Sequence, residues 1–180
     1  MLARTLASIG RLVAEARSAS VPVIYIKMVT YPGLDGWSPA YTRFMILKNG
    51  LPVDKAGAAP DSREAQIVDA VAPLPGELVI EKYRSSGFVG TNLEMVLRSR
   101  GRESVIVCGV ATHACVESTI RDAFNKDFYV VEVEDCVGAW ENELHQASLT
   151  MMRSRVEVVA LDAVVQAWRS IAPGRRAGAA

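Results

Sequence analysis

The sequence predicts an α/β protein built on a parallel sheet with helices on both faces. Five apolar runs of strand length, without strict alternation of polar and apolar residues, are separated by helical segments. Such runs are typical of strands buried on both faces, and their alternation with helices is typical of parallel sheets. The 180 residues suit one domain. We expect it to span residues 1–172, with a disordered tail over 173–180.

The predicted elements alternate regularly along the chain. Apolar residues at helical spacing predict a first helix over residues 2–16. Frequent Pro and Gly between residues 30 and 60 predict an irregular loop, and a loop of that length is usually functional. The five strands are expected at 21–26, 77–81, 104–110, 128–133 and 156–161. Further helices are expected at 63–71, 91–100, 115–126, 141–153 and 162–171.

Composition narrows the class of partner. The 20 basic and 20 acidic residues balance, so neither a nucleic acid nor a membrane surface is an expected partner. No apolar run approaches the roughly 20 residues that cross a bilayer. Charges at Arg4, Arg11 and Glu15 interrupt the stretch that a signal peptide would need, so a cytoplasmic location is expected. Three cysteines favour reduced thiols over a disulfide framework.

Three predicted strands end in residues suited to chemistry. Lys82 ends one strand, residues 109–115 follow the next, and Asp135 and Cys136 follow a third. In open parallel sheets, ligands bind outside the carboxyl ends of the strands. A lysine and a cysteine at neighbouring strand ends can therefore converge on one site. The alternative for Lys82 is an ordinary solvated lysine.

Cys115 lies where the loop 109–114 turns into the predicted helix 115–126. Free amides and partial positive charge at a helix N-terminus stabilise a thiolate, and the same amides can bind the oxyanion that forms when it attacks a carbonyl. Position alone supports a small buried side chain equally well. Cys108, inside a strand, and Cys136, in a predicted loop, are better explained by burial or exposure than by catalysis.

The two histidines carry weaker signals. His113 precedes Cys115 by two residues and could act as its base in a Cys–His dyad, although a polar loop residue is the simpler interpretation. His145 lies in a polar predicted helix and needs no function. Because no HxH, HxxxH or CxxC spacing is present, we expect neither a metal nor another cofactor.

Two segments resemble motifs of the isochorismatase-like cysteine hydrolases. Residues 109–119, GVATHACVEST, continuing through 121–123, are similar to the nucleophile motif of that family. Residues 82–88, KYRSSGF, are similar to its lysine motif and keep the lysine six residues before the phenylalanine. The resemblance extends from about residue 6 to residue 168.

This resemblance implies a fold, a mechanism and a set of site residues. The family folds as a three-layer α/β/α sandwich on a mostly parallel sheet of six strands, and its members use an Asp-Lys-Cys triad. By resemblance, Cys115 is the nucleophile, Lys82 stabilises the charged site, and the amides of Ala111 and Cys115 form the oxyanion hole. A cis peptide is expected between Val110 and Ala111, and the family implies a homo-oligomer.

The chain departs from the family at its first strand. The family's aspartate ends that strand in an Asp-x-Gln pattern, which is absent from a sequence that begins in the following helix. We therefore expect the first strand, central in the family's sheet, to be missing, with a truncated or wrongly assigned start favoured over a natural short form. Asp35 and Asp61 lie in the irregular loop and match no motif.

The residues discriminate partly between the chemistries of the family. Nicotinamidases hold a metal with an Asp-x-His pattern after the second strand, whereas residues 27–32 here contain no histidine. The segments around Lys82 and Cys115 look most similar to ureido-directed amidohydrolases, such as ureidoacrylate amidohydrolase and N-carbamoylsarcosine amidase. The expected function is hydrolysis of a small amide or ureido (N-carbamoyl) C–N bond. A non-catalytic or truncated homologue and a vinyl ether hydrolase of the isochorismatase type are the alternatives.

Overall fold

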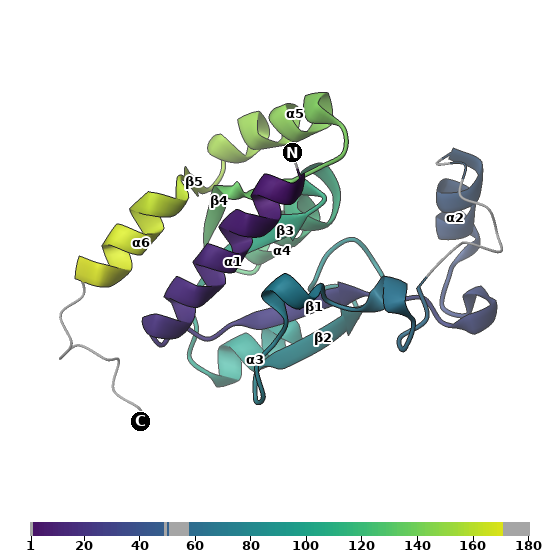
Figure 1. The fold of residues 1–180 in the computed structure, drawn as a ribbon. Helices are drawn as coiled ribbons and strands as arrows, with labels where there is room; N and C mark the ends of the chain where they lie inside the picture. The colour runs from purple at the N-terminus through teal and green to yellow at the C-terminus, as the bar shows by residue number, and fades with distance from the viewer. Residues whose placement is uncertain (1, 49, 51–57, 171–180) are drawn as a thin grey trace.

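A computed structural model describes residues 2–48, 50 and 58–170 and shows an α/β fold (Figure 1). The strands are β1 (Ile24–Met28), β2 (Leu78–Lys82), β3 (Ser104–Val110), β4 (Tyr129–Gly138) and β5 (Glu157–Val159). The helices are α1 (Leu2–Ser18), α2 (Pro39–Thr42), α3 (Leu93–Ser99), α4 (Glu117–Asn125), α5 (Asn142–Arg153) and α6 (Leu161–Ser170). Within the described ranges, no helix combines the length and apolar character needed to span a membrane.

The strand ladders are all parallel, as predicted, but they form two sheets rather than one. β1 pairs with β2, and β4 lies between β3 and β5. In the part of the chain that the structure describes, no ladder joins β1 to β3. β1 and β3 are therefore each hydrogen-bonded to a neighbouring strand on one edge in the described structure, and their apolar residues stay partly exposed. Most residues of β4 are buried by comparison.

Helices cover both faces of the strands, as predicted (Figure 1). On one face, Leu12 of α1 and Val164 and Val165 of α6 pack against Val133 of β4. On the other face, α3, α4 and α5 contribute a larger cluster that includes Leu97, Ile120, Leu149 and Met152. This second cluster also contacts Ile24 and Ile26 of β1 and Val105 and Val107 of β3, so one apolar core joins the two sheets.

Two local predictions are wrong. The helix expected over 63–71 is replaced by two short 3₁₀ turns, Arg63–Ala65 and Asp69–Val71, because Gln66 adopts an extended backbone conformation between them. Cys136 lies inside β4 and is fully buried rather than in a loop, because β4 extends to Gly138. The expected tail over 173–180 lies outside the described residues.

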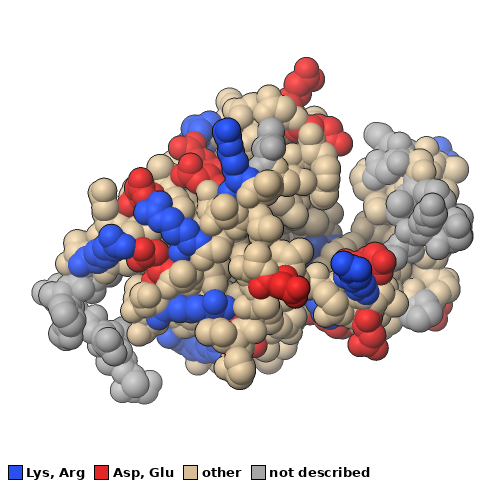
Figure 2. Space-filling view, in the orientation of Figure 1, with Lys and Arg blue, Asp and Glu red and all other residues tan. Residues whose placement is uncertain are grey.

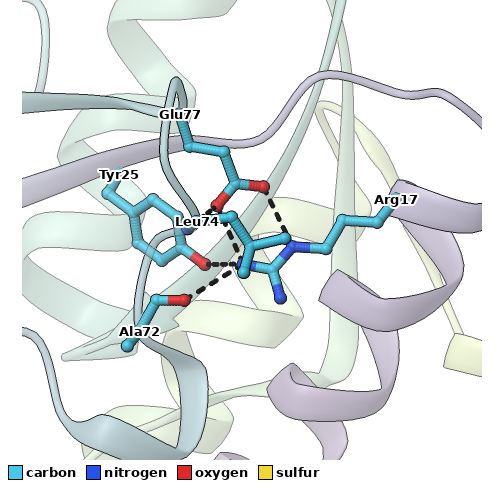
Figure 3. Close-up of polar contacts among 5 residues, drawn as sticks. All are labelled: Arg17, Tyr25, Ala72, Leu74 and Glu77. Carbon is cyan, nitrogen blue, oxygen red and sulfur yellow. Dashed lines mark hydrogen bonds and ion pairs between the residues drawn. The ribbon is translucent and has the colours of Figure 1, made fainter.

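An ion pair attaches the end of α1 to the segment that leads into β2 (Figure 3). Arg17 Nε and Nη2 donate to the two carboxylate oxygens of Glu77 at 2.9 and 2.8 Å, and Nη2 also donates to Tyr25 Oη and to the Ala72 carbonyl. The hydrogen bonds from Arg17 lower the pKa of Glu77. Since Glu77 immediately precedes β2, this contact helps to fix the strand that ends in Lys82.

Glu132 is a carboxyl group buried in the apolar sheet. Its side chain is fully buried in β4, and neither carboxylate oxygen has a hydrogen-bond partner among the described residues. Burial, with the Glu117 carboxylate adding to it, raises the pKa of Glu132 from 4.5 to about 7. Between these values the folded protein holds a proton that the unfolded chain has lost. The free energy of unfolding should therefore fall as pH rises through this window.

We predict that Glu132→Gln removes this pH dependence. Because the variant has no charge to bury, its free energy of unfolding above pH 7 should exceed that of the wild type by about 2 kcal/mol. Urea unfolding at a series of pH values from 4 to 8 measures the effect. Glu134→Gln is the control, since Glu134 lies on the same strand as Glu132, is partly exposed and pairs with Arg153 of α5. Parallel pH profiles for wild type and Glu132→Gln would contradict the prediction.

Candidate active site

Lys82 is the last residue of β2 and is almost completely buried, with 4% of its surface exposed. Its ammonium group donates to the carbonyls of Arg84 and Ser85, both at 2.9 Å, and to Cys115 Sγ at 3.1 Å. An ammonium has three hydrogens, so these three acceptors can satisfy it. A buried cation needs a compensating partner, and a thiolate at Cys115 would supply the negative charge.

Cys115 lies in a π-helical turn, Thr112–Val116, that leads directly into α4. The sequence predicts a helix that begins at Cys115, but helical structure begins three residues earlier. The amides of Ala114 and Val116 donate to the Ala111 carbonyl, which closes this turn. The peptide bond between Val110 and Ala111 is cis.

Thr119 links the two sequence motifs. Its hydroxyl donates to the Cys115 carbonyl at 2.7 Å and accepts from the Gly87 amide at 2.9 Å. The Thr119 side chain, on α4, therefore holds the segment after Lys82 against the turn that carries Cys115. The structure thus brings Lys82 and Cys115 together at the carboxyl ends of parallel strands.

The other two cysteines have different surroundings. Burial raises the pKa of Cys108 to about 11 and, with a smaller effect from Cys108, that of Cys136 to about 12. Both groups therefore remain thiols near neutral pH and are poor nucleophiles. Cys115, which lies beside the Lys82 ammonium, is therefore the expected site of thiol chemistry.

Neither histidine forms a dyad with the thiol in the described structure. His113 Nδ1 is buried and has no hydrogen-bond partner among the described residues. His145, for which the sequence predicts no function, is buried, and its Nδ1 lies 2.9 Å from Thr112 Oγ1. His145 and Ser148 are three residues apart, so both side chains lie on one face of α5.

The acidic residues near the strand ends do not join the site. Asp135 Oδ2 accepts from the Leu161 amide at 2.7 Å and so caps α6. Asp35 and Asp61 are exposed. Among the residues that the structure describes, no carboxylate forms an ion pair with Lys82, and no group of three or more His, Cys, Asp and Glu side chains is arranged to hold a metal.

Aromatic residues of the loop after β1 contact the segment that follows Lys82. Tyr31 and Tyr83 stack at 4.7 Å, and Tyr83 Oη donates to Tyr31 Oη, which raises the pKa of Tyr83 to about 12. The Arg84 guanidinium lies 4.8 Å from the centre of the Tyr41 ring and donates to the Gly36 carbonyl. Burial and the nearby Cys115 raise the pKa of Tyr41, while Arg84 opposes them. The surface in Figure 2 is hollowed beside the part of the molecule that carries α2.

The fold and the site define a class of protein. Parallel strands, helices on both faces and a buried lysine beside a cysteine at the strand ends form an α/β scaffold suited to thiol chemistry. The family model for the isochorismatase domain matches residues 2–163. The chain belongs to the isochorismatase family of hydrolases.

Proteins similar in sequence to this chain include ureidoacrylate amidohydrolases. The chain is 33% identical over 159 residues to ureidoacrylate amidohydrolase RutB of Methylobacterium radiotolerans, and the match covers 80% of this chain and 59% of the relative. The RutB protein of Pseudomonas syringae is 32% identical over 144 residues, covering 72% of this chain and 56% of the relative. The chain thus spans less than two thirds of the length of these relatives.

Solved structures show the same fold. A cysteine hydrolase from Pseudomonas syringae pv. phaseolicola superposes with a TM-score of 0.82 and 25% identity, covering 93% of this chain and 81% of that chain. N-carbamoylsarcosine amidase from Thermoplasma acidophilum gives a TM-score of 0.72 and 26% identity, covering 88% of this chain and 83% of that chain. The predicted family and the α/β fold class are confirmed.

Proposed function

We propose that this protein is a cysteine-dependent hydrolase of a small amide or ureido (N-carbamoyl) compound. The observation that supports this most directly is the 3.1 Å contact between the buried Lys82 ammonium and Cys115 Sγ. The similarity to ureidoacrylate amidohydrolases and to N-carbamoylsarcosine amidase favours a C–N bond as the target.

The proposed reaction has two steps. The Cys115 thiolate attacks the substrate carbonyl, and the amides of Ala111 and Cys115 stabilise the oxyanion. The C–N bond then breaks, the nitrogen takes up a proton from solvent water, and a thioester remains on Cys115 until a second water hydrolyses it. Lys82 stabilises the thiolate before the attack and after the release of the acid product.

The protonation of the leaving nitrogen is the weakest step at this site. General acid–base catalysis contributes about 10²–10⁴-fold, and the described residues bring no carboxylate to Lys82. Turnover of unactivated amides is therefore expected to be slow. The same observation favours a second candidate, a non-catalytic homologue that binds such compounds without hydrolysing them.

Ammonia release from a panel of small ureido acids and primary amides tests the proposal, together with intact mass spectrometry for an acyl group on Cys115. We expect ammonia release, or at least acylation of Cys115, with one or more members of the panel. If folded protein binds panel members but shows neither acylation nor ammonia release, the non-catalytic candidate is correct and the hydrolase proposal is wrong.

A further inference from the structure

A buried polar contact joins the turn that carries Cys115, Thr112–Val116, to α5. Thr112 is fully buried, and its hydroxyl lies 2.9 Å from Nδ1 of His145, which is itself only 7% exposed. Thr112 belongs to the turn that carries Cys115, whereas His145 belongs to α5. This contact therefore joins two elements that are separated by the whole of α4 and β4 in the sequence.

A second contact fixes α5 relative to α4. The Ser148 hydroxyl donates to Glu117 Oε2 at 2.6 Å, and Glu117 is also paired with Arg121 one turn further along α4. Ser148 is 1% exposed and lies one helical turn after His145. Since α5 is held in place by this bond and by the burial of Leu149 and Met152, His145 presents a fixed partner to Thr112.

The position of Thr112 makes this contact relevant to the chemistry. It directly follows Ala111 and precedes Cys115 by three residues, so a movement of Thr112 would displace both groups that are proposed to supply oxyanion-binding amides. Burial, with a smaller effect from His113, lowers the pKa of His145, so its ring is neutral at neutral pH and can share one hydrogen with the hydroxyl.

We infer that His145 is a positioning residue, which holds Thr112 and through it sets the geometry of the oxyanion-binding amides relative to the Cys115 thiolate. The inference rests on the proposed function, because it assigns a role within that reaction. It gives α5 a function that neither sequence motif contains. The thiolate itself is stabilised by Lys82, so His145 acts on oxyanion binding rather than on the formation of the thiolate.

Acylation by 4-nitrophenyl acetate isolates this step. The Cys115 sulfur forms a bond to the acetyl carbon, the ester C–O bond breaks, and 4-nitrophenolate leaves with the electron pair. No acid is needed for this leaving group, so the burst of nitrophenolate reports thiolate and oxyanion geometry alone. Alkylation by iodoacetamide involves no oxyanion and reports the thiolate alone.

For Thr112→Val and His145→Leu we expect the acylation burst to slow by about 10- to 100-fold, because small displacements of reacting groups have effects of this size. Iodoacetamide alkylation of Cys115 should stay within about threefold of wild type. Thr112→Ser keeps the hydroxyl and should restore most of the burst rate. The double variant should be little slower than either single variant, since one contact is lost in each case.

Thr150→Val is the matched control, because Thr150 is exposed on α5 and bonds only within its own helix in the described structure. If wild type acylates and the Thr112 and His145 variants acylate at the same rate, the positioning role is wrong. Equal losses in acylation and alkylation would assign only a packing role and overturn it as well. If Thr112→Val does not fold, His145→Leu and Thr112→Ser decide the question. A wild type that alkylates but never acylates would instead contradict the proposed function.

Discussion

Replacement of Cys115 by serine should lower the rate of acyl transfer by about 10⁴-fold or more, because the proposed nucleophile is removed and serine lacks a base to activate it. No histidine reaches Cys115 by a hydrogen bond in the described structure, so the serine hydroxyl would stay protonated. The 4-nitrophenyl acetate burst and ammonia release from the substrate panel measure the effect.

Labelling provides an independent readout of the same variant. At neutral pH, iodoacetamide should modify wild type at one position, since burial keeps Cys108 and Cys136 as thiols, and should leave Cys115→Ser unmodified. Unfolding in urea should expose the two remaining cysteines to the reagent. Cys108→Ser is the control and should keep the burst. Acylation of Cys115→Ser at a rate near wild type would show that another residue is the nucleophile.

Replacement of Lys82 by methionine should slow iodoacetamide alkylation of Cys115 at pH 7 by about 10-fold or more, because the thiolate loses its buried counter-charge. Acylation should fall at least as far. Stability is expected to respond differently. Methionine fills the volume without a charge to bury, so the free energy of unfolding should stay the same or rise. Labelling kinetics and urea unfolding on the same samples measure the two effects.

Lys27→Met is the matched control for this prediction. Lys27 lies on the neighbouring strand β1, is partly buried and pairs with Glu81 at 3.1 Å, and in the described structure no hydrogen bond joins it to Cys115. Its replacement should leave alkylation near the wild-type rate. A loss of labelling in Lys27→Met equal to that in Lys82→Met would assign the effect to general electrostatics rather than to the contact with Cys115.

The sequence predicts the elements best where a local pattern is strong. The stripe of α1 and the apolar runs of β2 and β3 are recovered with small changes at their ends. The prediction of a helix over 63–71 is wrong because local helix propensity does not anticipate the extended backbone conformation of Gln66. The prediction that Cys136 lies in a loop is wrong because β4 continues past the point where the apolar run weakens, and pairing with β3 decides how far the strand extends.

The sequence alone determined the family, the order of strands and helices, and the placement of Lys82 and Cys115 at strand ends, because motifs and hydrophobic periodicity are local properties of the chain. The tertiary structure alone decided which groups meet there. It placed the Lys82 ammonium against the Cys115 sulfur, left His113 Nδ1 without a hydrogen-bond partner among the described residues, and brought His145 of α5 within hydrogen-bond distance of Thr112. Such contacts join residues distant in sequence, and their geometry depends on how helices pack across a sheet, which no local pattern encodes.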